Sequence, residues 1–128
     1  MSIMAPISAG ELVDKITILR VKAARIGDPA KEANVRKELA LLEGIAAGAL
    51  PATPEIDRLT AELAEVNGAL WEIEDGKRDC ERRRDFGERF VELARSVYVE
   101  NDRRAAIKRA INGAVGSEIV EEKSYRAY

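Results

Sequence analysis

The stretch that decides the fold is PEIDRLTAELAEVNGALWEIEDGKRDCERRR, residues 54–84. Its apolar positions alternate in steps of three and four, which is the spacing of one face of a helix. The apolar members are Ile56, Leu59, Leu63, Val66, Leu70, Ile73 and Cys80, and Lys77 occupies one position of the same spacing. Thr53 supplies a cap and Pro54 a proline that a first helical turn tolerates. The stretch therefore predicts one long helix, with Gly68 and Gly76 as its weak points.

Two shorter helices are predicted upstream of this stretch. Ser8 followed by Glu11 forms a capping box, and apolar residues then recur with helical spacing over residues 9–26. Gly27 ends that helix, and a second begins after a very short turn and covers residues 29–47. Such a short turn predicts that the two helices are antiparallel neighbours.

Downstream, apolar residues again recur on one side from residue 86 onward, and polar residues 100–102 then interrupt the pattern. A break or kink near residue 100 would divide this part of the chain into a fourth and a fifth helix, the last weakening at Gly113 and Gly116. Residues 117–128 are too short and too charged for an element of their own. We expect a single helical domain over residues 1–116 and a C-terminal tail over residues 117–128.

The predicted fold is all-α, a helical hairpin or bundle of four to five helices with one long central helix and no sheet. The first and third helices would supply the main seam, the second would cover it, and residues 86–115 would pack across it. A helix over residues 54–84 is ~46 Å long, whereas its shorter neighbours reach only ~28 Å. We therefore expect one end of the long helix, residues 71–84, to overhang with its charged side chains in solvent.

Composition excludes several classes of function. The 128 residues carry 21 basic and 23 acidic side chains, so no overall positive field favours nucleic acid. Histidine is absent and Cys80 is the single cysteine, which excludes histidine-based triads, an internal disulfide and an ordinary zinc site. Any metal would therefore need carboxylate ligands. Glycine-rich nucleotide-binding motifs are also missing, and we predict neither a metal centre nor a cofactor. With neither a signal peptide nor a membrane-spanning apolar run, a cytoplasmic location is expected.

The candidate ligand site is a polar stripe formed by Asn101, Arg104, Lys108 and Asn112, whose spacing of three, four and four places them on one helical side. Arg104 also lies in line with apolar positions expected to face inward, and a buried guanidinium needs partners. Arginine binds carboxylates and phosphates through two parallel hydrogen bonds, and asparagine can orient such ligands. The stripe therefore predicts a site for a small anionic metabolite, in a binding protein or a small enzyme.

A purely structural interpretation competes with this one. Arg104 could pair with an acid of the first helix, Glu11 or Asp14, or with Glu100, in an internal ion-pair network. Such a network would gather the same polar residues without any ligand. Paired acids elsewhere, such as Glu121 and Glu122, could be read as metal ligands or acid–base groups, but acids on charged segments are usually solvated.

Self-association is the first function that the sequence predicts, and the anion site is its alternative. Trp71 flanks the apolar face of the long helix, and Tyr125 and Tyr128 lie in the aromatic tail, so these three are candidate interface residues. An overhanging helix and an aromatic tail indicate a homo-oligomer that acts through protein contacts. Cys80, on the apolar face, is expected to be a small buried hydrophobe.

Three segments carry a resemblance to a known family. They are GELVDKITILRVKAARI at 10–26, LWEIED at 70–75 and ELARSVYVENDRRAAIKRAINGAVGSEIVEEKSY at 92–125. In these segments the chain resembles a bacterial family, domain of unknown function 6165. The resemblance covers most of the chain and is most specific in the last third. It implies one bacterial domain and assigns no activity or catalytic residue.

Overall fold

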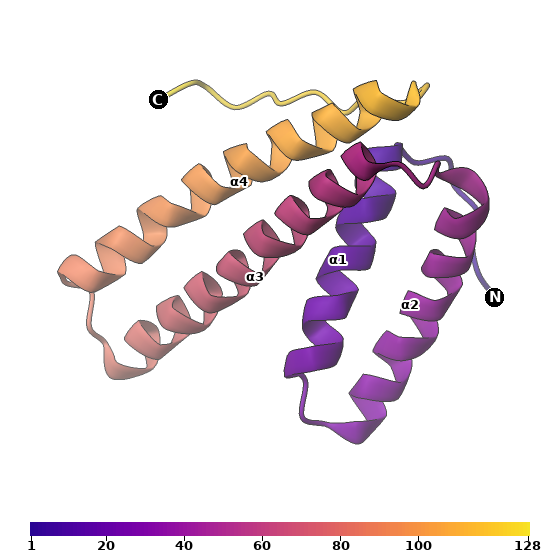
Figure 1. The fold of residues 1–128 in the computed structure, drawn as a ribbon. Helices are drawn as coiled ribbons and strands as arrows, with labels where there is room; N and C mark the ends of the chain where they lie inside the picture. The colour runs from indigo at the N-terminus through magenta and orange to yellow at the C-terminus, as the bar shows by residue number, and fades with distance from the viewer.

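The computed structural model describes residues 1–128 and contains four helices and no strand (Figure 1). The helices are α1 (Ala9–Arg25), α2 (Pro29–Ala49), α3 (Pro54–Arg83) and α4 (Glu88–Val115). The prediction of an all-α fold with one long helix is confirmed, and the first three helices end within two residues of their predicted bounds. The division into five helices is wrong, because α4 is continuous.

Helix α4 continues through residue 100 because its polar residues there find partners along or beside the helix. Glu100 accepts a hydrogen bond from Arg103 at 3.0 Å, and Asn101 accepts one from Arg104 at 2.8 Å. Asp102 pairs with Lys123 of the tail. Side-chain pairs three residues apart stabilise a helix, so residues that favour turns in isolation are accommodated within it.

The predicted caps begin three of the four helices. The side chains of Ser8, Asp28 and Thr53 each accept a backbone N–H from the first turn of the helix that follows. These bonds satisfy amides that have no partner inside the helix. Arg84, which follows α3, and Gly116, which follows α4, both adopt the left-handed conformation that closes a helix.

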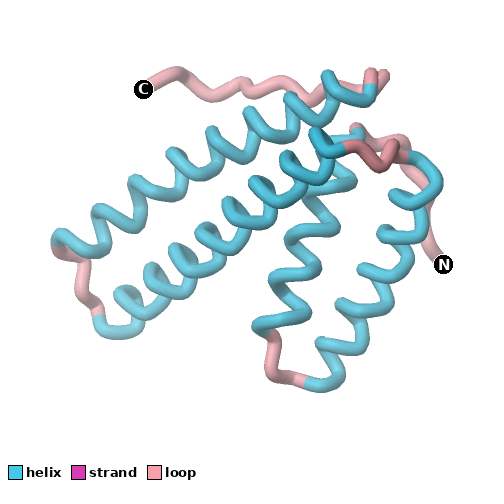
Figure 2. The backbone as a smooth tube through the Cα atoms, viewed as in Figure 1, coloured by secondary structure: helices cyan, strands magenta, loops and turns pink.

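The four helices form two antiparallel hairpins, α1–α2 and α3–α4, as Figures 1 and 2 show. The hairpins meet at one end, where α1 and α3 begin and α2 and α4 end, and they splay apart away from it. Helix α1 packs against the other three, whereas α2 packs against α1 alone. The expectation that the second helix covers the seam between α1 and α3 is therefore wrong.

The expected overhang of the long helix is also absent. Because α4 does not break, its 28 residues nearly match the 30 of α3, and the two lie side by side along their length. Cys80, near the end of α3, is fully buried, which confirms its predicted role as a hydrophobe. The charged pairs Glu74–Arg78 and Asp79–Arg83 form on the solvent side as predicted.

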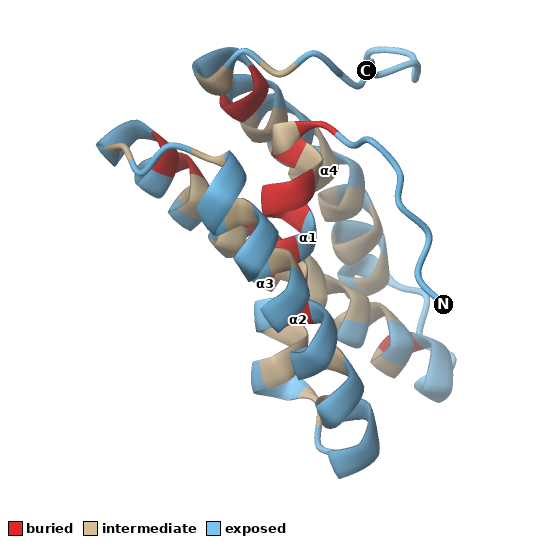
Figure 3. Ribbon diagram, turned by 90° about the vertical axis from the view of Figure 1, so that its right-hand side faces the viewer, coloured by how far each residue is buried: buried red, intermediate tan, exposed pale blue.

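The apolar core has two parts, and α1 contributes residues to both. One joins α1 to the start of α3 and the end of α4, and the other joins α1 to α2. The first contains Val13, Ile56, Leu59, Leu63 and Ile111, and the second contains Leu12, Ile16, Leu19 and Leu39. Figure 3 shows buried residues gathered on α1 and the neighbouring helix ends, while the outer side of α2 is exposed.

The backbones of α1 and α4 come close together at Gly10, which has less room for a side chain than any other glycine of the chain. A Cβ atom added to Gly10 would lie 2.5 Å from the backbone oxygen of Lys108. A backbone atom cannot rotate away as a flexible side chain can, so only glycine fits without moving a helix. In contrast, a Cβ atom at Gly68 of α3 would meet nothing within 4 Å.

We predict that Gly10→Ala destabilises the protein and that the matched change Gly68→Ala stabilises it. Alanine favours a helix by about 1 kcal/mol over glycine, and Gly68 should show that gain. At Gly10 the clash should outweigh it, at a cost of about 1–3 kcal/mol. Urea unfolding of the two variants measures both effects. Equal stability of the two variants would contradict the close approach.

Candidate functional site

A polar network lies where α1, α3 and α4 meet. Asn67 of α3 is buried, and its Nδ2 donates to Oδ1 of Asp14 at 2.9 Å and to Oγ1 of Thr17 at 2.8 Å. Asp14 and Thr17 both belong to α1 and are also buried. Buried amides and hydroxyls require such partners, so this network holds α1 and α3 in one relative position.

Asn112, the last residue of the predicted stripe, links α4 to the start of α1. Its side chain is buried, and Oδ1 accepts the backbone N–H of Gly10 at 2.7 Å. That N–H belongs to the first turn of α1 and has no partner within its own helix. Asn112 of α4 therefore caps the start of α1. Its Oδ1 is occupied by this structural hydrogen bond.

Lys108 is surrounded by carboxylates. Its Nζ lies 2.6 Å from Oε2 of Glu11, 3.7 Å from Oδ2 of Asp14 and 3.3 Å from Oε2 of Glu121. Partial burial alone would lower the pKa of Lys108, but the hydrogen bond to Glu11 and the nearby negative charges raise it above its ordinary value. Lys108 is thus a charged group whose field is already neutralised within the protein.

The pKa of Glu11 moves in the opposite direction. Burial opposes ionisation of this carboxyl, but the hydrogen bond from Lys108 and the positive charges of Lys108 and Lys15 lower its pKa below the ordinary value. Oε1 of Glu11 also forms an ion pair with Nζ of Lys15, 3.7 Å away along its own helix. The Glu11–Lys108 pair therefore stabilises the contact between α1 and α4 in its charged form.

Arg104 is partly buried and has no carboxylate partner. Its guanidinium donates to Oδ1 of Asn101 at 2.8 Å and to Oδ1 of Asn67 at 3.4 Å, both neutral amide oxygens. The acids expected to pair with it lie elsewhere, because Glu11 and Asp14 surround Lys108 and Glu100 pairs with Arg103. The internal ion-pair network exists, but it contains Lys108 and not Arg104.

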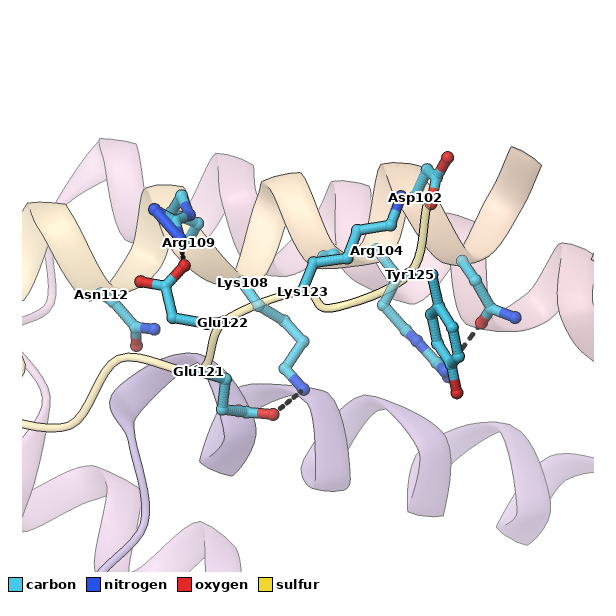
Figure 4. A pocket seen from close by; sticks show the side chains of 11 residues that line it. Asp102, Arg104, Lys108, Arg109, Asn112, Glu121, Glu122, Lys123 and Tyr125 are labelled. Atoms are coloured by element: carbon cyan, nitrogen blue, oxygen red, sulfur yellow. Dashed lines mark hydrogen bonds and ion pairs between the residues drawn. The ribbon is translucent and has the colours of Figure 1, made fainter. Parts of the chain in front are cut away.

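All four residues of the predicted stripe line one pocket of ≈ 360 Å³ between α4 and the tail (Figure 4). The other charges of this pocket occur as pairs. Lys108 faces Glu121 at 3.3 Å, Arg109 faces Glu122 at 2.5 Å, and Lys123 contacts Asp102. Arg104 is the one cation of the pocket without an acidic partner.

A second hollow of ≈ 400 Å³ also has Arg104 in its wall, so Arg104 lines both. It is formed by Ile18 of α1 and by Asn67, Leu70, Trp71 and neighbouring residues of α3. Trp71, predicted as an interface residue, is partly buried and lies in its wall. Arg104 can therefore be approached from two directions.

The predicted interface residues of the tail do not line the same hollow as Trp71. Tyr128 packs on Tyr98 of α4 with ring centroids 4.8 Å apart, and Tyr125 lines the pocket beneath the tail. Both tail tyrosines are exposed. The structure brings the four stripe residues together but does not join the three aromatic ones into a single surface.

Sequence reasoning did not identify Asn67 and Thr17. A usable signal was present, because Asn67 directly follows Val66 in the inward stripe of α3 and Thr17 directly follows Ile16 in that of α1. A polar residue beside an apolar stripe indicates a buried hydrogen bond. Glu121 and Glu122 pair with cations of α4, and no group of three or more acidic or cysteine side chains is placed to hold a metal ion.

The fold and this site define a small all-helical domain with a polar pocket beside its last helix. The model of a family described as "Family of unknown function (DUF6165)" matches residues 3–128, and the chain belongs to that family. Neither curated proteins nor solved structures give a match. None of the four helices is long and apolar enough to cross a membrane.

We predict that Glu11→Gln lowers stability by about 1 kcal/mol, and only over a defined pH range. The folded pKa of Glu11 is lowered, so its contribution is present above the unfolded pKa of about 4.3 and is lost as pH falls through the folded value. The folded pKa of Lys108 is raised, so its contribution is present below about 10.4 and is lost as pH rises through the folded value.

Urea unfolding across pH measures this effect as the difference between the native protein and the variant. Glu62→Gln, which removes an exposed pair with Arg58, is the control and should change stability by less than about 0.5 kcal/mol. A difference for Glu11→Gln that persists at strongly acidic pH would contradict the assignment.

Proposed function

We propose that this protein binds a small anion, a carboxylate or a phosphate, through the guanidinium of Arg104. The observation that carries the proposal is that Arg104 is partly buried and yet contacts only the amide oxygens of Asn101 and Asn67. A buried guanidinium is ordinarily paired with an anion, because desolvation of its charge is costly. A ligand would supply the missing charge.

The hydrogen-bonding capacity of Arg104 supports this proposal. A guanidinium has five N–H donors, and the two amide contacts use two of them. The same contacts restrict the rotation of a long side chain, so less conformational entropy is lost when an anion binds. Asn101 and Asn67 are therefore positioning residues for Arg104.

Lys108 and Asn112 have a different part in this proposal from the one that their spacing predicts. Lys108 is neutralised by Glu11 and Asp14, and Asn112 caps α1, so both hold the helices that position Arg104. An arginine that positions an anion can serve a binding protein or an enzyme acting on that anion. The proposal concerns the binding step, which is common to both.

We predict that an anion raises the melting temperature of the native protein but not that of Arg104→Met. Ligand at ~100 times its dissociation constant adds ~2.7 kcal/mol, which is several degrees for a domain of this size. Thermal unfolding against a panel of phosphates, nucleotides and organic acids measures the shift. Arg103→Met is the matched control, because Arg103 is exposed and pairs with Glu100, and it should keep the response.

The opposite outcome is equally informative. If every anion shifts the melting temperature of Arg104→Met and of the native protein alike, Arg104 is not the anchor. If no member of the panel shifts the native protein, anion binding at this site is wrong.

We also propose self-association as a second function, with the outer side of α2 as the contact surface. Helix α2 packs against α1 alone and carries Leu41 and Ile45 exposed, at 60% and 44%. Apolar side chains grouped on one unpartnered helix side favour a homo-oligomer. The overhang that first indicated self-association does not exist, so this surface takes its place.

We predict that light scattering at micromolar concentration gives a mass above that of one chain. Replacing Leu41 and Ile45 together by lysine should give a monomer, because two charges would be buried without partners in the interface. Val91→Lys, an equally exposed apolar position on α4, is the control and should leave the mass unchanged. A single-chain mass for the native protein would exclude this second function.

A further inference from the structure

The hollow beside Trp71 has a composition suited to an organic ligand. Its volume is ≈ 400 Å³, and Ile18, Leu70 and Trp71 supply apolar surface beside the guanidinium of Arg104. Ligand sites commonly combine apolar walls with a few polar groups that fix orientation. The lining of the pocket beneath the tail is more polar, and its cations other than Arg104 already face acids.

The charges around this hollow leave one group of each sign without a partner. Arg78 pairs with Glu74 at 2.6 Å, and Glu74 also accepts from Lys77 at 3.1 Å. Arg104 has no carboxylate partner, and Asp75, which also lines the hollow, forms no ion pair with a cation. The hollow therefore presents an unpaired positive and an unpaired negative charge beside an indole ring.

We propose that the ligand of Arg104 is a small zwitterion with an apolar body, of the class of amino acids with apolar side chains. Its carboxylate binds Arg104, its ammonium group lies toward Asp75 and Trp71, and its apolar part packs against Leu70 and Ile18. The face of an indole ring attracts cations, and the carboxylate of Asp75 would attract the same ammonium group through its charge. This inference rests on the proposed function of Arg104 and names the ligand class and the side of approach.

The single tryptophan of the chain makes the inference directly testable. Because Trp71 lines the hollow, a ligand bound there changes its fluorescence, whereas a ligand beneath the tail does not contact it. Three probes of similar shape separate the charges. Phenylalanine carries both charges, phenylpropionate lacks the ammonium group, and phenethylamine lacks the carboxylate.

We expect saturable fluorescence changes with phenylalanine, and an affinity about three- to tenfold higher than that of phenylpropionate. Arg104→Met should weaken both by roughly tenfold or more, because a charge-assisted hydrogen bond is lost. Asp75→Asn should remove only the preference for phenylalanine. Asp57→Asn, at an exposed acid of the same helix outside the hollow, should leave that preference intact.

Different failures have different meanings. Equal affinity for phenylalanine and phenylpropionate, or a preference that survives Asp75→Asn, would overturn the zwitterion inference while leaving Arg104 as an anion anchor. The same holds if anions raise the melting temperature through Arg104 without any response of Trp71 to the three probes. If neither measurement depends on Arg104, the proposed function falls together with the inference.

Discussion

The close contact between α1 and α4 at Gly10 determines the rest of the structure. Without a side chain at Gly10, the backbones approach until its N–H reaches Oδ1 of Asn112 at 2.7 Å. That approach places the first turns of α1, with Glu11 and Asp14, next to Lys108 of α4. A larger residue would separate the helices and weaken the hydrogen bond and the ion pairs together.

The contact at Gly10 also determines which cation of α4 pairs with the acids of α1 and which has no acidic partner. Lys108 and Arg104 are one helical turn apart and would compete for the acids of α1. Because α1 crosses α4 near Lys108, its acids reach Lys108, and Arg104 instead meets the buried amide of Asn67. The close packing at Gly10 thus directs the acids of α1 to Lys108 and leaves Arg104, one helical turn away on α4, without a counter-charge. This unpaired guanidinium is the basis of the proposed function.

The local structure could be predicted from the sequence because it depends on short-range pattern. Caps at Ser8, Asp28 and Thr53 and the stripe from Ile56 to Cys80 locate the first three helices. The spacing of Asn101, Arg104, Lys108 and Asn112 likewise places these residues on one side of α4, where they line one pocket. The continuity of α4, the place of α2 and the different partners of Arg104 and Lys108 depend on how helices meet, which spacing along one helix does not determine.

The splay of the two hairpins gives the hollow beside Trp71 its place. Helices α1 and α3 diverge from their common end (Figure 1), and the hollow is lined by Ile18 of α1, by residues of α3 and by Arg104 of α4. Trp71 and Leu70 lie on that part of α3, and Asn67 holds α1 and α3 together on the side where they still meet. The divergence of α1 from α3 is therefore accompanied by a partly exposed indole ring in the same hollow as the guanidinium of Arg104.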